Sequence, residues 1–366
     1  MKLFRRIIKL MLLAIAALVV LVILIGATLG YIFSAPGYTG EESDHFDGER
    51  FVNRDTVRTE PGLRAILKFT FQEKRAPWPD WIDNTDYPPP PARVGNGDLR
   101  VTFINHATTL IQMDGLNILT DPIWSERCSP VSWAGPRRHR APGVTLENLP
   151  PLDVILISHN HYDHCDIPTL KTLSVSHQNA RIIAGLGVGA LLEQNGIAHV
   201  EEIDWDDSLS LSDVVALRGV TAQHFSGRGF FDRNKTLWLG CVISSPAGSV
   251  YFAGDTGYGA HFRQIGEKYG PIRLALLPIG AYLPSWFMRP VHISPSEAVD
   301  AHRDLGAQTS IAVHFGTFRL GADGETQPAD DLRRALSAHR DVRFWVLDQG
   351  EGRDVPAVSL RNGITR

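Results

Sequence analysis

Five histidines and two aspartates, all residue types that bind metal ions, are spaced so that they could do chemistry together. Four of them fall within the segment His159-Asn160-His161-Tyr162-Asp163-His164, and the others are His224, Asp255 and His314. Imidazole and carboxylate ligands suit zinc, and they also suit iron or manganese. Unrelated surface or core histidines would not gather in this way, so the sequence predicts a metal site.

Short apolar runs indicate the elements that must position these residues. The runs lie at 154–157, 214–217, 250–253 and 310–313, and each one leads toward a predicted ligand. Runs of this length and composition are typical of buried strands. We therefore expect the ligands in loops at one edge of a sheet, where a rigid scaffold commonly carries a site.

The spacing divides the ligands between two ions, and we expect two zinc ions per chain. Side chains two positions apart in an extended segment point the same way, so His159 and His161 are assigned to the first ion. His224 follows the strand predicted at 214–217 and is assigned to the same ion.

A second ion is assigned to Asp163, His164 and His314. The chain turns toward Asp166, a predicted helix N-cap, so Asp163 and His164 can face away from the first ion. Asp255 is the predicted bridge, because a carboxylate has two oxygens. Two metal ions about 3.5–4 Å apart activate water and stabilise charge on an attacked phosphoryl or acyl centre.

The pattern H-x-H-x-D-H, followed by a distant His, an Asp and a last His, resembles the metallo-β-lactamase superfamily. The resemblance implies an α/β fold, an αββα sandwich with a dinuclear site along one edge. Further motifs make the chain similar to the family of N-acylphosphatidylethanolamine-hydrolysing phospholipase D and its bacterial relatives. The motifs, between about residues 95 and 350, are Asn105–Thr108, Leu119–Ile123, Gly135–Arg138, Ser158–Asp166, Gly254–Tyr258, Leu277–Tyr282, Trp286–Met288 and His314–Thr317.

This resemblance implies hydrolysis of the phosphodiester on the headgroup side, which would give phosphatidic acid and an N-acylethanolamine. It also implies an active-site histidine at His292, which could donate a proton to the leaving alkoxide or hold a phosphate oxygen. Tyr162 could hydrogen-bond the same phosphate, and Asp163 is counted with both as catalytic. A structural role is the alternative for His292 and Tyr162.

Several features depart from the mammalian enzyme of that family, among them an apolar N-terminal segment, and three that line or border the site leave the acyl or headgroup preference open. They are Cys165, Val291 and the segment 225–231. Cys165 is expected either beside the metal site or as a buried thiol. His106 is not assigned as a ligand, and Asp121 is either a turn residue or a partner that orients a ligand histidine.

Other segments have two interpretations each. The basic loop Arg137–Arg140 could bind a phosphate through its guanidinium groups, or it is a solvated surface loop. The apolar side chains of 280–292 could line an acyl-chain groove, touch a bilayer or pack in the core. A helix is predicted over 296–304, with a capping pattern that begins at Ser294.

Composition limits the classes of function. The chain has 366 residues, of which 43% are hydrophobic, and a net charge of −4. This length supports one large core with extensions, and the charge gives no reason to expect nucleic acid as a partner. The three cysteines do not make a disulfide framework.

An apolar, uncharged segment at 10–33 is long enough to cross a hydrocarbon core of about 30 Å. Basic residues precede it and acidic residues follow it, which predicts a cytoplasmic N-terminus and a catalytic domain across the membrane. A cleavable signal peptide is the rival, but its apolar region would be shorter and Ala35-Pro36 is a poor cleavage point. We expect a single-pass anchor in the inner membrane, with the catalytic domain in the periplasm.

These features divide the chain into five parts. They are a cytoplasmic tail (1–9), a transmembrane signal anchor (10–33), an N-terminal extension (34–95), a hydrolase domain (96–352) and a C-terminal tail (353–366). Within the extension, Phe46–Phe51 is expected to pack on the main body.

The leading hypothesis is a membrane-anchored dinuclear zinc hydrolase that cleaves a phosphodiester, in a phospholipase D-type reaction on N-acylphosphatidylethanolamine or a related phospholipid. The alternatives are a metal-dependent amide or ester hydrolase and a non-catalytic metal-binding envelope protein. Expected partners are a membrane phospholipid and the bilayer, and a homodimer stays open. A β-lactamase is disfavoured, because Asp163 and His164 stand where a cysteine ligand would be needed. A nuclease would need a basic stripe with interleaved aromatics.

Overall fold

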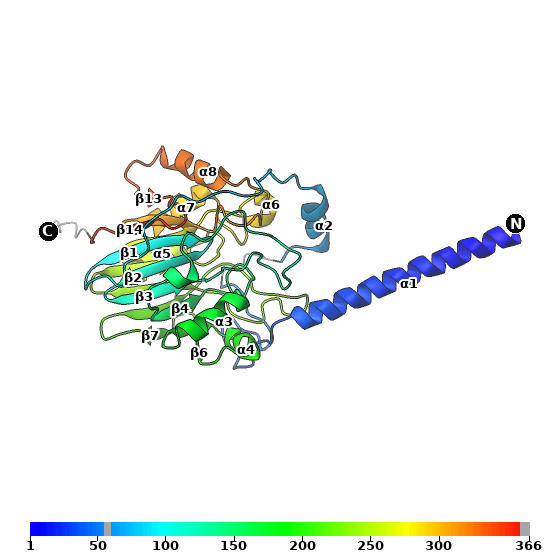
Figure 1. Cartoon of the computed structure of the whole chain (residues 1–366), viewed down its shortest axis with the longest axis horizontal. Coiled ribbons are helices and arrows are strands. Elements are labelled where there is room, and N and C mark those ends of the chain that lie inside the picture. The colour runs from blue at the N-terminus through cyan, green and yellow to red at the C-terminus, as the bar shows by residue number, and fades with distance from the viewer. Residues whose placement is uncertain (55–59, 359–366) are drawn as a thin grey trace.

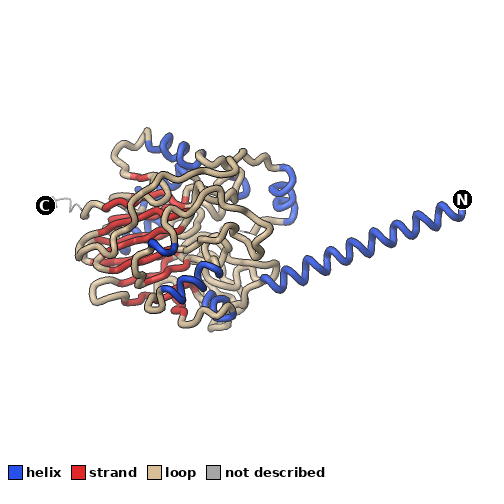
Figure 2. Tube along the Cα trace, viewed as in Figure 1, coloured by secondary structure: helices blue, strands red, loops and turns tan. Residues whose placement is uncertain are grey.

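A computed structural model describes residues 1–54 and 60–358 of the chain. Two seven-stranded sheets pack face to face, and helices cover their outer faces (Figure 1). Figure 2 shows the strands gathered in the middle of the body, while one helix projects far away from it. The predicted αββα sandwich is therefore confirmed.

The elements of the first sheet are β1 (Leu99–Asn105), β2 (Thr108–Met113), β3 (Leu116–Thr120), β4 (Val154–Ile157), β5 (Arg181–Gly185), β6 (Val200–Ile203) and β14 (Gly352–Asp354). Those of the second are β7 (Ser208–Ser210), β8 (Ala216–Val220), β9 (Gly240–Ser245), β10 (Gly248–Phe252), β11 (Ile272–Pro278), β12 (Ser310–Val313) and β13 (Phe344–Trp345). The helices are α1 (Lys2–Phe33), α2 (Leu63–Gln72), η1 (Leu146–Asn148), α3 (Ile167–Ser176), α4 (Val188–Gln194), α5 (His261–Tyr269), α6 (Ser285–Met288), α7 (Pro295–Asp304) and α8 (Gln327–Leu336).

Both sheets repeat one pattern of strand pairing. The first has the order β14-β1-β2-β3-β4-β5-β6 and the second the order β13-β12-β11-β10-β9-β8-β7. Strands pair antiparallel from β14 to β3 and from β7 to β10, and in parallel from β3 to β6 and from β10 to β13. Because parallel strands end at the same edge, each sheet presents a row of loops there.

Apolar side chains fill three layers of core. One cluster lies between the sheets and includes Phe103 of β1 and Phe252 of β10. A second joins the first sheet to α3 and α4, and a third joins the other sheet to α5, α7 and α8. Burial of such side chains stabilises a fold by about 25 cal/mol per Å² of apolar surface. These layers fix the two sheets, and so the loops between them.

The N-terminal extension is part of this core. Phe46 and Phe51 are fully buried between the sheets, as predicted. α2 was not predicted. The strand β14 crosses the boundary predicted between residues 352 and 353, and residues 359–366 of the predicted tail lie outside the described part of the chain.

Hydrogen bonds hold the end of α1 against the body of the protein. By length and composition this helix is able to cross a membrane, and its most apolar window is not buried in the structure. Just after the helix, the backbone N–H of Ala35 donates a hydrogen bond of 2.8 Å to the Asp232 carboxylate. The same carboxylate accepts hydrogen bonds from the backbone N–H groups of Arg228 (2.9 Å) and Gly229 (2.8 Å). Asp232 is completely buried, so the end of α1 is held against the loop that follows His224.

Candidate metal centre

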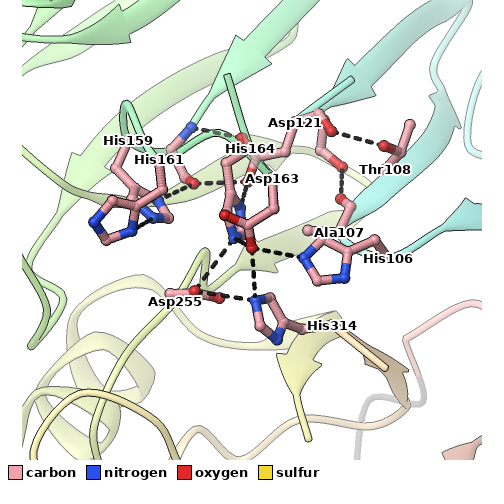
Figure 3. A network of polar contacts seen from close by, with 12 residues as sticks. His106, Ala107, Thr108, Asp121, His159, His161, Asp163, His164, Asp255 and His314 are labelled. Atoms are coloured by element: carbon pink, nitrogen blue, oxygen red, sulfur yellow. Dashed lines mark hydrogen bonds and ion pairs between the residues drawn. The ribbon is translucent and has the colours of Figure 1, made fainter. Parts of the chain in front are cut away.

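The ligand-rich segment begins where β4 ends. Ile157 is the last residue of β4, and the chain then runs as a loop to Asp166, the residue that precedes α3. This loop carries four of the seven predicted ligands into the space between the sheets (Figure 3). Asp255 and His314 come from loops that follow β10 and β12, and His224 from the loop after β8. The structure thus brings all seven residues together.

His159, His161 and His224 form the first group of converging nitrogens. His161 Nδ1 lies 2.7 Å from His159 Nε2 and 3.3 Å from His224 Nε2. In His159 and His224 the other ring nitrogen is hydrogen-bonded. His159 Nδ1 is 2.9 Å from Ser158 Oγ, and His224 Nδ1 is 2.9 Å from the Val291 carbonyl oxygen. Burial lowers the pKa of all three histidines, that of His161 to about 4, so near neutral pH each ring is neutral and has one nitrogen without a proton.

A second group surrounds the Asp163 carboxylate. Asp163 Oδ2 lies 3.2 Å from His164 Nε2 and 3.3 Å from His314 Nε2. Asp121 Oδ2 accepts a hydrogen bond of 2.6 Å from His164 Nδ1, which fixes the ring so that Nε2 faces inward. Asp121 also binds the backbone N–H and hydroxyl of Ser158. Of the two alternatives for Asp121, these contacts favour the partner that orients a ligand histidine.

Asp255 lies between the two groups. Its Oδ2 is 3.2 Å from both His164 Nε2 and His314 Nε2, and 3.8 Å from His224 Nε2. Among the described residues, Asp255 Oδ1, His164 Nε2 and His314 Nε2 are buried side-chain atoms that make no hydrogen bond. Buried polar atoms normally have partners. Unpaired nitrogens and carboxylate oxygens that converge on one space fit a divalent cation.

The charges at the site support the same conclusion. Burial alone would raise the pKa of Asp163 and of Asp255, but the neighbouring histidines hold both pKa values well below normal. Burial likewise opposes protonation of His314, yet Asp255 and Asp163 raise its pKa to about 9. Two buried carboxylates thus draw positive charge into the site, and a divalent ion is able to supply it.

His106 is a residue that the sequence analysis left unassigned. Its Nε2 lies 2.8 Å from Asp163 Oδ2, and it belongs to a group with Asp163, His164 and His314 whose candidate ligand atoms lie within 4.8 Å of one another. Its backbone has a positive φ of 47°, which is uncommon for a residue other than glycine. The available signal was the Asn105-His106-Ala107 turn between two strands.

His292 borders the site, whereas Tyr162 faces Arg228. His292 Nδ1 lies 3.8 Å from Asp255 Oδ2, and burial lowers the pKa of His292 to about 4. A cavity of about 370 Å³ lies beside it, lined by Tyr282, Ser285, Arg289, His292, Ser294, Ser296 and Glu297. The Arg228 guanidinium lies 3.8 Å from the centre of the Tyr162 ring.

Two other expectations are now decided. Cys165 is completely buried against the α3 side of the first sheet, and burial raises its pKa to about 11, so it is the buried thiol of the two alternatives. The arginines of the basic loop have other partners. Arg138 donates to backbone carbonyl oxygens of Ser125 and Ile123, and Arg140 pairs with Glu325. The guanidinium groups of Arg138 and Arg140 are therefore engaged within the protein.

The chain belongs to the metallo-β-lactamase superfamily, because residues 116–315 match the family described as the beta-lactamase superfamily domain. Within it, the chain is similar to N-acyl-phosphatidylethanolamine-hydrolyzing phospholipase D 1 of Caenorhabditis elegans, with 37% identity over 69% of this chain and 75% of that protein. It is 38% identical to an uncharacterized protein of Mycobacterium tuberculosis, over 84% of each chain.

A solved structure has the same fold. It is a metallo hydrolase from Ignicoccus hospitalis, which aligns with a TM-score of 0.54 and 22% identity over 71% of this chain and 99% of that one. Fold, relatives and ligand set together make this protein a metal-dependent hydrolase of the metallo-β-lactamase fold.

Proposed function

We propose that this protein is a membrane-anchored, dinuclear zinc phosphodiesterase that performs a phospholipase D-type reaction on N-acylphosphatidylethanolamine or a related phospholipid. The observation that carries the proposal is the position of Asp255 between two clusters of inward-facing nitrogens. The relative from Caenorhabditis elegans, which is named for hydrolysis of that lipid, supports the substrate class.

In this proposal the seven residues act as ligands in two sets. His159, His161 and His224 would hold one ion, and Asp163, His164 and His314 would hold the other, with Asp255 available to both. A metal pair bound there would supply Lewis-acid stabilisation of the phosphoryl oxygens and would activate water. Asp121 keeps His164 in the tautomer whose Nε2 is free to bind, because it accepts the Nδ1 proton.

His292 is proposed to act on the phosphodiester from the cavity side. Its ring is 5.2 Å from that of His224 and 5.4 Å from that of His314, and its candidate ligand atom lies within 4.8 Å of those of His224 and Asp255, so it lies beside both clusters. From there it either binds a phosphate oxygen or gives a proton to the departing alkoxide. Tyr162 is proposed to hydrogen-bond the same phosphate, and the Arg228 guanidinium lies against its ring.

The membrane anchor in this proposal is α1. Its apolar composition and the basic residues Lys2, Arg5, Arg6 and Lys9 support a cytoplasmic N-terminus in the inner membrane, with the catalytic domain in the periplasm. A cleaved signal sequence is the competing interpretation of the same helix.

Oxygen-18 water tests the choice of bond. The purified, metal-loaded chain is incubated with N-acylphosphatidylethanolamine in labelled water, and the products are weighed by mass spectrometry. We expect the label in phosphatidic acid, because water attacks phosphorus. Label in a released fatty acid would establish an acyl hydrolase instead, which is the second enzyme hypothesis.

His292→Ala separates the two roles of that residue. A general acid contributes about 10²–10⁴-fold in rate, and most when the leaving group is poor. If His292 is the acid, turnover of the lipid should fall much more than turnover of an aryl phosphodiester, whose leaving group needs no proton. Equal losses on both substrates would identify His292 as a phosphate-binding residue. Metal content should stay unchanged in either case.

A further inference from the structure

The helix α2 presents an apolar stripe to solvent. Leu63, Ile66, Leu67 and Phe71 are exposed, Leu63 by 72% and Phe71 by 78%. Residues at this spacing lie on one face of a helix, and a helix of a soluble domain normally turns such a face toward the core. α2 has no buried residue at all. The stripe therefore needs an apolar partner outside the described part of the chain.

The opposite face of α2 is held by α6. The rings of Phe69 and Phe287 stack with 4.5 Å between their centres, and Lys68 Nζ lies 4.1 Å from the centre of the Trp286 ring. Trp286 Nε1 donates to Glu73 just after α2. These contacts fix the roll of the helix, so the apolar stripe faces outward because its other side is occupied.

The surroundings indicate what the stripe meets. α2 protrudes from the same side of the body as α1 (Figure 1). Where α1 ends, Phe230 is 75% exposed beside Gly30, and the Phe231 N–H donates to Ser34 Oγ. Besides Lys68, which packs on Trp286, the segment 63–75 carries three basic residues and one acidic residue, a charge that suits anionic headgroups.

We propose that α2 is an interfacial helix that lies in the surface of the bilayer crossed by α1, with its apolar stripe among the acyl chains. An amphipathic helix with basic residues binds a membrane in this way. The proposal rests on the proposed anchoring by α1. It also gives α2 a function in substrate delivery. α2 packs on α6, and Ser285 of α6 lines the cavity beside His292. A lipid headgroup that leaves the bilayer at α2 is thus delivered next to the metal centre.

Fluorescence quenching tests the contact without any need for activity. The three native cysteines are buried, so Leu67→Cys and Phe71→Cys can be labelled with a fluorophore in the full chain, reconstituted in vesicles of neutral and anionic phospholipid. Val175→Cys on α3 is the matched control, because Val175 is an apolar residue on another helix and, at 70% exposed, is as open to solvent as the test positions require. Lipids with a nitroxide in the acyl chain should quench the labels at 67 and 71 and leave the label at 175 bright.

Quenching that is absent at 67 and 71, or equal at all three positions, would overturn the proposal. A second copy of the chain on α2 would shield the labels from lipid and from soluble quenchers alike, and that result would overturn it too. Since quenching needs no turnover, it remains decisive if the proposed phosphodiesterase activity is not found.

The double variant Leu63→Glu/Leu67→Glu supplies the functional comparison. It should lower turnover of lipid in vesicles by about tenfold or more, because the two introduced glutamates keep this face of α2 out of the acyl region. Turnover of a soluble aryl phosphodiester should be unchanged. If both substrates are lost equally, α2 supports the fold of the site and does not deliver lipid. If the unaltered chain cleaves neither substrate, the proposed function fails and the quenching result stands alone.

Discussion

At the scale of single residues, the Asp163 carboxylate meets three histidines at close range. Its Oδ2 lies within 3.3 Å of nitrogens from His106, His164 and His314. A metal ion of the second set would take two of these imidazoles as ligands, and His106 would remain to hold the carboxylate. Groups that orient a ligand in this way commonly tune metal affinity.

His106→Gln should therefore weaken the second ion selectively. Loss of such an orienting partner typically costs about 10–100-fold in metal affinity, and the first set does not contact His106. Zinc titration against a chromogenic chelator should show one weakened ion and one unchanged ion per chain. His302→Gln, at a buried histidine of α7 outside the centre, is the control and should leave both affinities intact. Two equally weakened ions would contradict a specific role for His106.

Asp255→Asn should lower the content of both ions, because the neutral amide loses the charge that the two sets share. A dinuclear centre holds about two ions per chain, and elemental analysis of the purified variant should find fewer. Asp304→Asn, at a carboxylate of α7 that binds Tyr258, provides a matched loss of charge away from the site. Full loading together with normal activity in Asp255→Asn would refute the bridge.

At the scale of elements, prediction succeeded where a local pattern carries the information. The apolar runs before His159 and His314 became β4 and β12, and the predicted capping box of Ser294 and Glu297 starts α7. α2 was missed, although the helical spacing of its apolar residues was a local signal that could have revealed it. The contact of His106 with Asp163 spans 57 residues and depends on strand packing, which no local pattern encodes.

The helix α7 also carries a titratable group that links stability to pH. His302 is buried, its Nδ1 lies 2.7 Å from Ser310 Oγ, and burial lowers its pKa from 6.5 to about 4. Between these two pH values the unfolded chain binds more protons than the folded chain. The stability contributed by neutral His302 is thus present above pH 6.5 and is lost as the pH falls toward 4.

This linkage amounts to about 3 kcal/mol over the whole window, at about 1.4 kcal/mol per pKa unit. Denaturant unfolding at a series of pH values should show a smaller acid loss of stability in His302→Gln than in the unaltered chain. Parallel curves for the two proteins would show that His302 does not titrate in this way.

At the scale of the whole molecule, the proposed topology puts α1 across the membrane and the sandwich outside the cytoplasm. A reporter enzyme that works only in the periplasm, fused to the C-terminus, should be active, and one that works only in the cytoplasm should not. The fusion should also keep the mass of the uncleaved chain in the membrane fraction. A soluble product shortened by the length of α1 would instead identify a cleaved signal sequence.

The buried Asp232 carboxylate, which fastens the end of α1 to the loop after His224, has a kinetic consequence under this topology. A catalytic domain held at a fixed height by such a junction meets its substrate by lateral diffusion, as a two-dimensional search. Its rate then follows the mole fraction of substrate among the lipids of the bilayer and does not depend on the total concentration of substrate in the sample. Inert lipid added to the same membrane would dilute the substrate and slow the reaction, although every substrate molecule is still present.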